Sequence, residues 1–161
     1  MGRHPVLLLD LDGVVSPLAG GRLAPLPATW PDWIEAEPGV WVAPAMLDAL
    51  AALPVERRWL SSWEHEIEGL SRDIGWPGMP WLPLPATTRG WSKCAALRDW
   101  QAQHPHRPLC WIDDDPRVLS SGRRWARTLA VPTLLLRPQK RVGLTPHHIG
   151  RIAAWCAGLP R

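Results

Sequence analysis

Val6–Leu9 is a run of large apolar residues that ends at two aspartates, Asp10 and Asp12, followed at once by Gly13. Apolar runs of this length without polar alternation are typical of strands that are buried on both faces of a parallel sheet. In open α/β sheets, ligands bind at the carboxyl ends of such strands, where a glycine allows a sharp turn. The segment therefore predicts a central strand whose end carries polar chemistry.

A second apolar run ends in the same way. Leu109–Ile112 is followed directly by Asp113, Asp114 and Asp115. Carboxylates gathered at strand ends repel one another unless a cation lies between them, so the two clusters together predict a divalent-cation site. Asp115 precedes Pro116 and is interpreted instead as the N-cap of the following helix.

Strand-like and helix-like segments alternate along the chain, which predicts an α/β fold. The expected strands are 6–10, 57–61, 109–113 and 131–137, and the expected helices are 44–53, 63–73, 91–103, 116–127 and 145–157. This alternation predicts a Rossmann-like three-layer α/β/α sandwich with a central, mostly parallel sheet. We expect a single domain over residues 1–161, because that length suffices for one substantial core.

Two segments rich in proline interrupt this pattern. Residues 16–39 contain many proline, glycine, alanine and tryptophan residues without a clear period, so we expect a long ordered loop. Residues 41–42 are either a short strand or the return of this loop to the core. Residues 76–85 alternate proline with tryptophan and leucine and can hold only a short strand.

Lysine is rare in this chain, since Lys93 and Lys140 are the only lysines among 18 basic residues. The preference for arginine, like the use of 12 tryptophans with no phenylalanine or tyrosine, follows from a GC-rich genome. A site that needs a compact point charge cannot exchange lysine for arginine. Lys93, at the start of an expected helix, is therefore a candidate site residue.

The remaining composition excludes some classes of protein. The formal net charge of +3 allows an anionic partner without demanding one. The apolar runs are too short to cross a membrane, and Asp10 and Asp12 interrupt any signal-peptide core, so we expect a soluble cytoplasmic protein. Cys94, Cys110 and Cys156 have neither zinc-site spacing nor a disulfide framework.

Four segments now fall at strand ends or helix starts. They are Asp10-Leu11-Asp12-Gly13, Ser61, Lys93 and Asp113-Asp114. In this order they resemble the four motifs of the haloacid dehalogenase (HAD) superfamily, over about residues 6–137. The first motif matches closely and the fourth well, whereas the middle two are single residues placed by spacing. The second motif of the family is often threonine, and Ser61 supplies only the hydroxyl.

The resemblance implies a Mg²⁺-dependent phosphohydrolase. Asp10 would be the nucleophile that forms an aspartyl-phosphate, and Asp12 would be the general acid and base. Mg²⁺ would be bound by Asp10, by the backbone carbonyl of Asp12 and by Asp113. Asp114 would support the metal through water or a hydrogen bond, although an exposed carboxylate at a strand end is the alternative.

The resemblance also implies that Lys93 holds the nucleophile and the phosphate charge, and that the Ser61 hydroxyl donates to a phosphate oxygen. A solvated helix residue is the alternative for Lys93. Ser61 can instead be a helix N-cap, with Ser62 as the phosphate ligand. His65, Arg89 and Arg137 are candidates for the pocket lining, with a solvent-exposed position favoured for each, and His147-His148 are expected to cap or flank the last helix.

Many members of the superfamily insert a cap domain that selects small substrates. Residues 16–39 are too few and too rich in proline for a folded cap, so this chain is similar to capless members. An open site favours a macromolecular or extended phosphorylated substrate, or a partner subunit that lends a cap.

A bacterial HAD subgroup that resembles the phosphatase-like modules of RNA repair proteins is similar to this chain in further segments. These are Trp59-Leu60-Ser61-Ser62-Trp63-Glu64, Trp91-Ser92-Lys93, and Leu134-Leu135-Leu136 followed by Val142-Gly143-Leu144-Thr145. This likeness makes phosphorylated nucleic-acid ends one candidate substrate and small phosphomonoesters the other. Trp30, Trp33 or Trp41 can stack a base, with packing in the core as the favoured alternative. A binding or regulatory module that keeps the fold without turnover is the alternative function.

Overall fold

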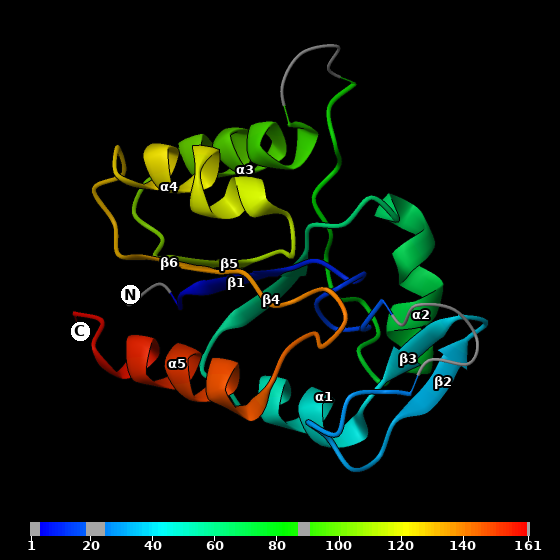
Figure 1. The fold of residues 1–161 in the computed structure, drawn as a ribbon. Coiled ribbons are helices and arrows are strands. Elements are labelled where there is room, and N and C mark those ends of the chain that lie inside the picture. Colours follow the sequence, from blue (N-terminus) through cyan, green and yellow to red (C-terminus); the bar gives the residue numbers. More distant parts are fainter. Residues whose placement is uncertain (1–3, 19–24, 87–90, 161) are drawn as a thin grey trace.

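The computed structural model describes residues 4–18, 25–86 and 91–160 (Figure 1). Its centre is a four-stranded sheet with the strand order β4-β1-β5-β6, in which every neighbouring pair is parallel. The strands are β1 (Val6–Leu9), β4 (Glu56–Trp59), β5 (Leu109–Ile112) and β6 (Thr133–Leu136). The predicted α/β class and the parallel sheet are confirmed, and the architecture is compatible with a Rossmann-like fold.

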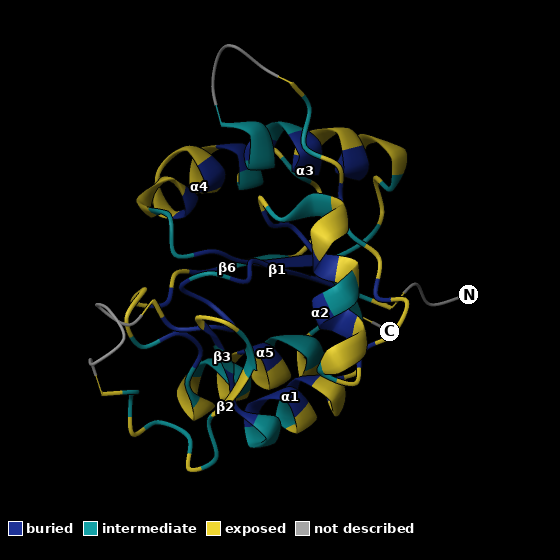
Figure 2. Ribbon diagram, turned by 90° about the vertical axis from the view of Figure 1, so that its right-hand side faces the viewer, coloured by how far each residue is buried: buried dark blue, intermediate teal, exposed yellow. Residues whose placement is uncertain are grey.

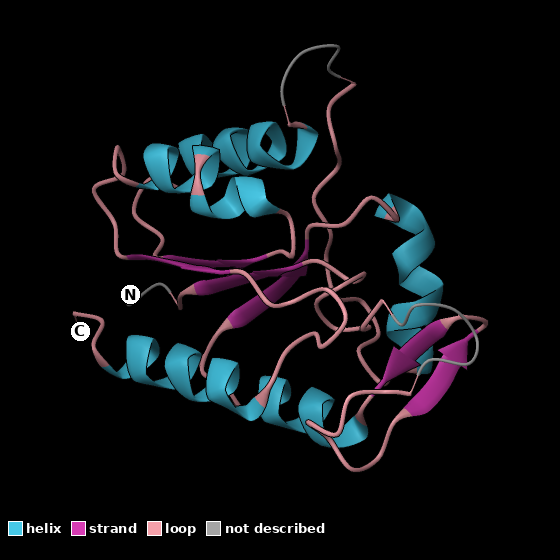
Figure 3. Ribbon diagram, viewed as in Figure 1, coloured by secondary structure: helices cyan, strands magenta, loops and turns pink. Residues whose placement is uncertain are grey.

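Helices flank the sheet on both sides (Figures 1 and 3). The helices α3 (Ser92–Gln103) and α4 (Ser121–Ala126) lie on one side, and α1 (Pro44–Ala51) and α5 (Pro146–Ala157) lie on the other. A 3-10 helix, η1 (Glu64–Glu66), leads into α2 (Ile67–Asp73) after β4. None of the helices in the described part of the chain is long and apolar enough to span a membrane.

The strand β1 is buried on both faces, as its unbroken apolar run predicts. Leu7 and Leu9 belong to an apolar cluster that includes α1 and α5, whereas Val6 and Leu8 belong to a second cluster that includes α3. Side chains alternate across a strand, so one short segment contributes to both clusters. Figure 2 shows the sheet as a buried layer between helices whose outer faces are exposed. The polar end of β1 is thereby fixed by the core.

The predicted helix starts at Asp115 and Thr145 are confirmed. The Asp115 carboxylate accepts a hydrogen bond from the backbone N–H of Arg117, and Thr145 forms a capping box with His148. The single helix expected over 116–127 is wrong in one respect. It is divided at Ser120 (φ −113°, ψ −84°) into a 3-10 helix, η2 (Pro116–Leu119), and α4.

The long loop predicted over 16–39 is also wrong in its last part. Its described part includes β2 (Ile34–Glu37), which pairs with β3 (Val40–Val42) as an antiparallel hairpin. The turn is made possible by Gly39, whose φ of +82° lies in the left-handed region that favours glycine. In the second proline-rich segment, Trp81 forms an isolated parallel bridge with Trp59.

Candidate active site

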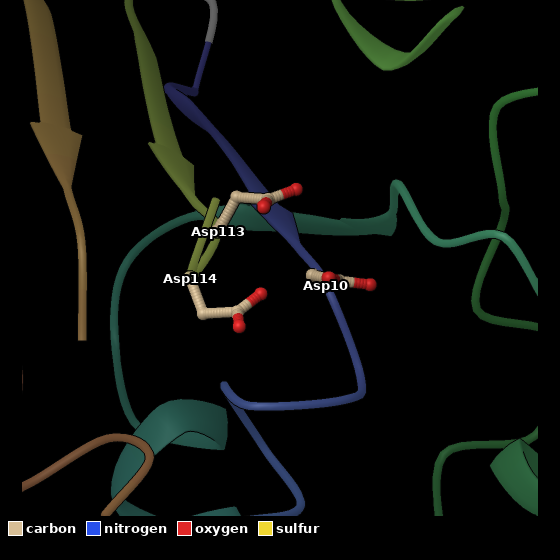
Figure 4. Close-up of side chains that lie close together, drawn as sticks. All are labelled: Asp10, Asp113 and Asp114. Carbon is tan, nitrogen blue, oxygen red and sulfur yellow. The ribbon is translucent and has the colours of Figure 1, made fainter. Parts of the chain in front are cut away.

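The acidic residues that follow β1 and β5 lie together at one edge of the sheet (Figure 4). Because the two strands are parallel neighbours with Leu9 opposite Ile112, their carboxyl ends coincide. Asp10, Asp113 and Asp114 each offer a carboxylate oxygen, and these three oxygens lie within 4.8 Å of one another. Asp10 and Asp113 are buried, whereas Asp114 is half-buried. The predicted convergence of the two acidic segments is confirmed.

Lys93 joins two of these carboxylates. It is the second residue of α3, and its Nζ atom donates to Asp10 Oδ2 at 2.5 Å and to Asp113 Oδ2 at 2.8 Å. The Lys93 side chain is only 13% exposed, which excludes the alternative of a solvated helix residue. A lysine at a helix N-terminus faces an unfavourable helix dipole, so its position is maintained by the two carboxylates.

The other oxygens of the bridged pair are held by backbone groups. Asp10 Oδ1 accepts from the N–H of Leu11 at 2.8 Å, and Asp113 Oδ1 accepts from the N–H of Asp115 at 2.9 Å. Both carboxylates are therefore oriented from two sides. Such fixed orientation is what a nucleophile or a metal ligand requires before its partner arrives.

The cluster carries more negative than positive charge. Asp10, Asp113 and Asp114 against Lys93 give a formal charge of −2. Burial raises the pKa of Asp10 to about 6, with Lys93 lowering it and Asp113 raising it further. Burial, and then the charge of Asp113, also raise the pKa of Asp114. Burial acts to lower the pKa of Lys93, but the two carboxylates outweigh it and raise that pKa.

The donor set fits a hard divalent cation such as Mg²⁺. All three side chains offer carboxylate oxygens, the ligands that Mg²⁺ prefers, and a cation would relieve the surplus negative charge. Within the described part of the chain, no other side chain donates a hydrogen bond to the Asp114 carboxylate. Asp10, Asp113 and Asp114 are thus the residues that can hold the metal.

Gly13 allows Asp114 to approach β1. Its φ is +74°, and a Cβ atom at this position would lie 2.7 Å from both Cγ and Oδ2 of Asp114. Any side chain here would be strained by its backbone and would collide with a carboxylate of the cluster. The close approach of Asp114 therefore explains why a glycine, Gly13, follows Asp10 and Asp12 in the sequence.

Asp12 lies outside the three-carboxylate cluster. Its Oδ2 atom accepts a hydrogen bond of 3.0 Å from the indole Nε1 of Trp63, which follows β4. The side chain is thus fixed separately from the side chains that can hold the metal. The predicted contribution of the Asp12 backbone carbonyl to the metal stays a prediction.

Ser61 lies at the end of β4, beside β1, because the N–H of Leu60 donates to the carbonyl of Leu9 at 2.7 Å. Ser61 is buried and its hydroxyl accepts a long hydrogen bond of 3.4 Å from the N–H of Trp63, whereas Ser62 is exposed. Ser61 therefore caps the turn after β4. The phosphate contact expected of Ser61, or of Ser62 in its place, stays a prediction.

The other candidates lie at the margin of the site or away from it. His65 is exposed, and the exposed Arg137 donates from Nε to the backbone carbonyl of Asp114 at 3.0 Å. Arg89 lies outside the described residues. The indoles of Trp30 and Trp33 donate to the carbonyls of Leu144 and Pro27 and pack against the core, which favours packing over base stacking.

Trp63 was missed as a candidate site residue by sequence reasoning. It stands 51 residues from Asp12, and no motif or spacing in the sequence joins the two.

Comparison of the chain with models of protein families, with curated proteins and with solved structures gives no match.

Proposed function

We propose that this chain is a Mg²⁺-dependent phosphohydrolase of the HAD type, acting on phosphomonoesters through an aspartyl-phosphate at Asp10. The observation that carries the proposal is the bridge from Lys93 to Asp10 and Asp113 at the ends of two neighbouring parallel strands. Asp114 stands beside this bridge, and the Asp12 carboxylate, two residues after Asp10 in the chain, is held separately by Trp63. In this proposal Asp10 is the nucleophile, Lys93 the cation and Asp12 the acid and base, while Asp10, Asp113 and Asp114 would hold the metal.

In the first step, an Asp10 carboxylate oxygen attacks phosphorus, and the bond from phosphorus to the leaving oxygen breaks. The Asp12 carboxyl gives its proton to that leaving oxygen, which departs as an alcohol. Lys93 keeps Asp10 in place and offsets charge on the phosphoryl oxygens. Mg²⁺, when bound, supplies further positive charge to those oxygens.

In the second step, Asp12 acts as a base instead of an acid, and Asp10 is the leaving group instead of the nucleophile. Asp12, now a carboxylate, takes a proton from water while the water oxygen attacks phosphorus. The bond between phosphorus and Asp10 breaks, which releases phosphate and restores both carboxyl groups to their starting states. Phosphoryl transfer depends chiefly on positioning and on charge stabilisation, and the buried, bridged carboxylates favour both.

The proposal includes the three-layer HAD architecture without a folded cap. What supports the lack of a cap is that the described residues between β1 and α1 contain a small hairpin, β2–β3, and no larger folded unit. An open site suits extended substrates, so phosphorylated nucleic-acid ends and small phosphomonoesters are both candidates. The proposal includes a cytoplasmic location, which the free thiols of Cys94, Cys110 and Cys156 support because disulfides are rare in that compartment.

The experiment is phosphate release by the wild type and by Asp10→Asn, with and without Mg²⁺. The panel contains an aryl phosphate, nucleoside monophosphates, sugar phosphates and oligonucleotides phosphorylated at the 5′ or the 3′ end. We expect metal-dependent release that falls by at least about 10³-fold in Asp10→Asn, because the nucleophile is lost. No release from any substrate by a folded wild type that binds Mg²⁺ would instead favour a binding or regulatory module.

A further inference from the structure

The Trp63 indole is the group that fixes the Asp12 carboxyl. Its Nε1 donates to Asp12 Oδ2 at 3.0 Å across 51 residues of sequence, from the turn after β4 to the turn after β1. Both side chains are half-buried, so this contact is neither freely solvated nor part of the sealed core.

The turn that carries Trp63 is itself held in place by hydrogen bonds. The N–H of Trp63 donates to Ser61 Oγ at 3.4 Å, and the N–H of Glu64 donates to the carbonyl of Ser61 at 3.3 Å. Among the described residues other than glycine, Glu64 alone has a left-handed backbone, with φ of +47°. Such strain persists where the surroundings enforce it, and here the Glu64 carboxylate accepts from the N–H of Leu84 at 2.9 Å.

We infer that Trp63 is a positioning residue for the acid–base chemistry of Asp12, and this inference rests on the proposed function. The indole N–H can only donate, so it requires Asp12 Oδ2 to accept. Because the indole occupies Oδ2, we assign to Oδ1 the proton that Asp12 gives to the leaving oxygen and later takes from water. Trp63 thus determines which oxygen of Asp12 faces the reaction, without touching Asp10, Asp113 or Asp114 in the described hydrogen bonds.

The inference predicts that Trp63→Phe depends on the leaving group of the substrate. An alkyl phosphate needs a proton on its leaving oxygen, whereas a nitrophenyl phosphate leaves readily without one. We expect kcat/KM for the alkyl phosphate to fall by about 10-fold to 100-fold, and that for the aryl phosphate by less than about 3-fold. A merely structural role would lower both values by the same factor.

Trp81→Phe is the matched control, because the Trp81 indole also donates to a carboxylate, at 2.8 Å to Glu68, away from the carboxylate cluster. We expect Trp81→Phe to leave both kcat/KM values within about 2-fold of the wild type. Mg²⁺ binding by Trp63→Phe should stay unchanged, which shows that the variant is folded and retains its metal site.

A double-mutant cycle separates the inference from the proposed function. In an Asp12→Ala background, single-turnover release of nitrophenol should be the same with Trp63 and with Phe at this position. A further loss in that background, or equal losses for both leaving groups in Trp63→Phe alone, would overturn the inference while the phosphatase activity stands. Absence of wild-type activity on either substrate would instead overturn the proposed function.

Discussion

The two ends of the central sheet carry opposite balances of charge. At the amino ends, Glu56 at the start of β4 is paired with two arginines, Arg58 and Arg107, and Arg107 also donates to the carbonyl of His4. At the carboxyl ends, three aspartates lie together, and Lys93, which pairs with Asp10 and Asp113, is the one cation in ion pairs with them in the described part of the chain. At the amino ends, the negative charge of Glu56 is balanced by arginines. At the carboxyl ends, the buried cluster keeps a surplus of negative charge.

This difference in charge balance suggests a structural ion-pair network at the amino ends of the strands and a candidate active site at their carboxyl ends. Burial acts to raise the pKa of Glu56, but its hydrogen bonds with Arg107 and Arg58 outweigh it and hold that pKa below its usual value. Burial raises the pKa of Asp10, and Lys93 does not fully offset it. A carboxylate that the protein leaves poorly compensated is one that a ligand can stabilise.

The largest expected effect is that of Lys93→Met. Without Mg²⁺, we expect the free energy of unfolding to fall by about 3 kcal/mol, because two buried carboxylates lose the one cation that pairs with them among the described residues. Glu56→Gln, which breaks both pairs at the other end, should cost at most about 1 kcal/mol because its side chain is 36% exposed. Urea denaturation of both variants gives these values.

The rate of phosphate release tests the role of Lys93 at the carboxyl ends directly. Lys93→Ala should impair phosphate release far more than Lys140→Ala, since Lys140 is exposed and contributes only a backbone carbonyl to the hydrogen bonds described. Equal activity of the two alanine variants would exclude a catalytic role for Lys93. Equal destabilisation by Lys93→Met and Glu56→Gln would show that the two ends of the sheet are electrostatically alike.

A pair of glycine variants tests whether close packing against Gly13 is needed for the metal site at the carboxyl ends of the strands. Gly13→Ala and Gly39→Ala both force a side chain into the left-handed region, at a cost of about 1–2 kcal/mol each. Only at Gly13 would the new Cβ meet the Asp114 carboxylate, since nothing lies within 4 Å of a Cβ at Gly39. We expect weakened Mg²⁺ binding in Gly13→Ala alone, measured by titration. Unchanged Mg²⁺ binding by folded Gly13→Ala would contradict the close approach.

The smallest effect is on the pH dependence of metal binding. An acid whose pKa is raised to about 6 keeps its proton at mildly acidic pH, and Mg²⁺ must displace that proton from Asp10. The affinity for Mg²⁺ should therefore be constant well above pH 6 and fall by up to about tenfold per pH unit below it. Equal affinities at about pH 5 and about pH 7 would contradict this.

The sequence was most informative where residues act locally. The apolar runs Val6–Leu9 and Leu109–Ile112 predicted two buried strands, and the parallel geometry then brought their aspartates together. Asp115 and Thr145 marked helix starts because their side chains bond to backbone groups a few residues on. These features need only neighbours in the chain and the general geometry of a parallel sheet.

The sequence was least informative where the fold joins distant segments. The strand β2 was missed because Ile34–Glu37 is short, partly exposed and set among prolines, although Pro38-Gly39 is a usable turn signal. The contact of Trp63 with Asp12, the approach of Asp114 to Gly13 and the network around Glu56 depend on side chains brought together by the folded chain.

The most direct test of the charge imbalance is a calorimetric titration of Mg²⁺ into the wild type and Asp114→Asn. Asp114 is half-buried and receives no described hydrogen bond from another side chain, so its amide variant should fold. We expect the wild type to bind Mg²⁺ at one site, and Asp114→Asn to bind it about 10-fold to 100-fold more weakly. No binding by the folded wild type, or equal affinity in the variant, would show that the carboxyl end of the sheet is not a metal site.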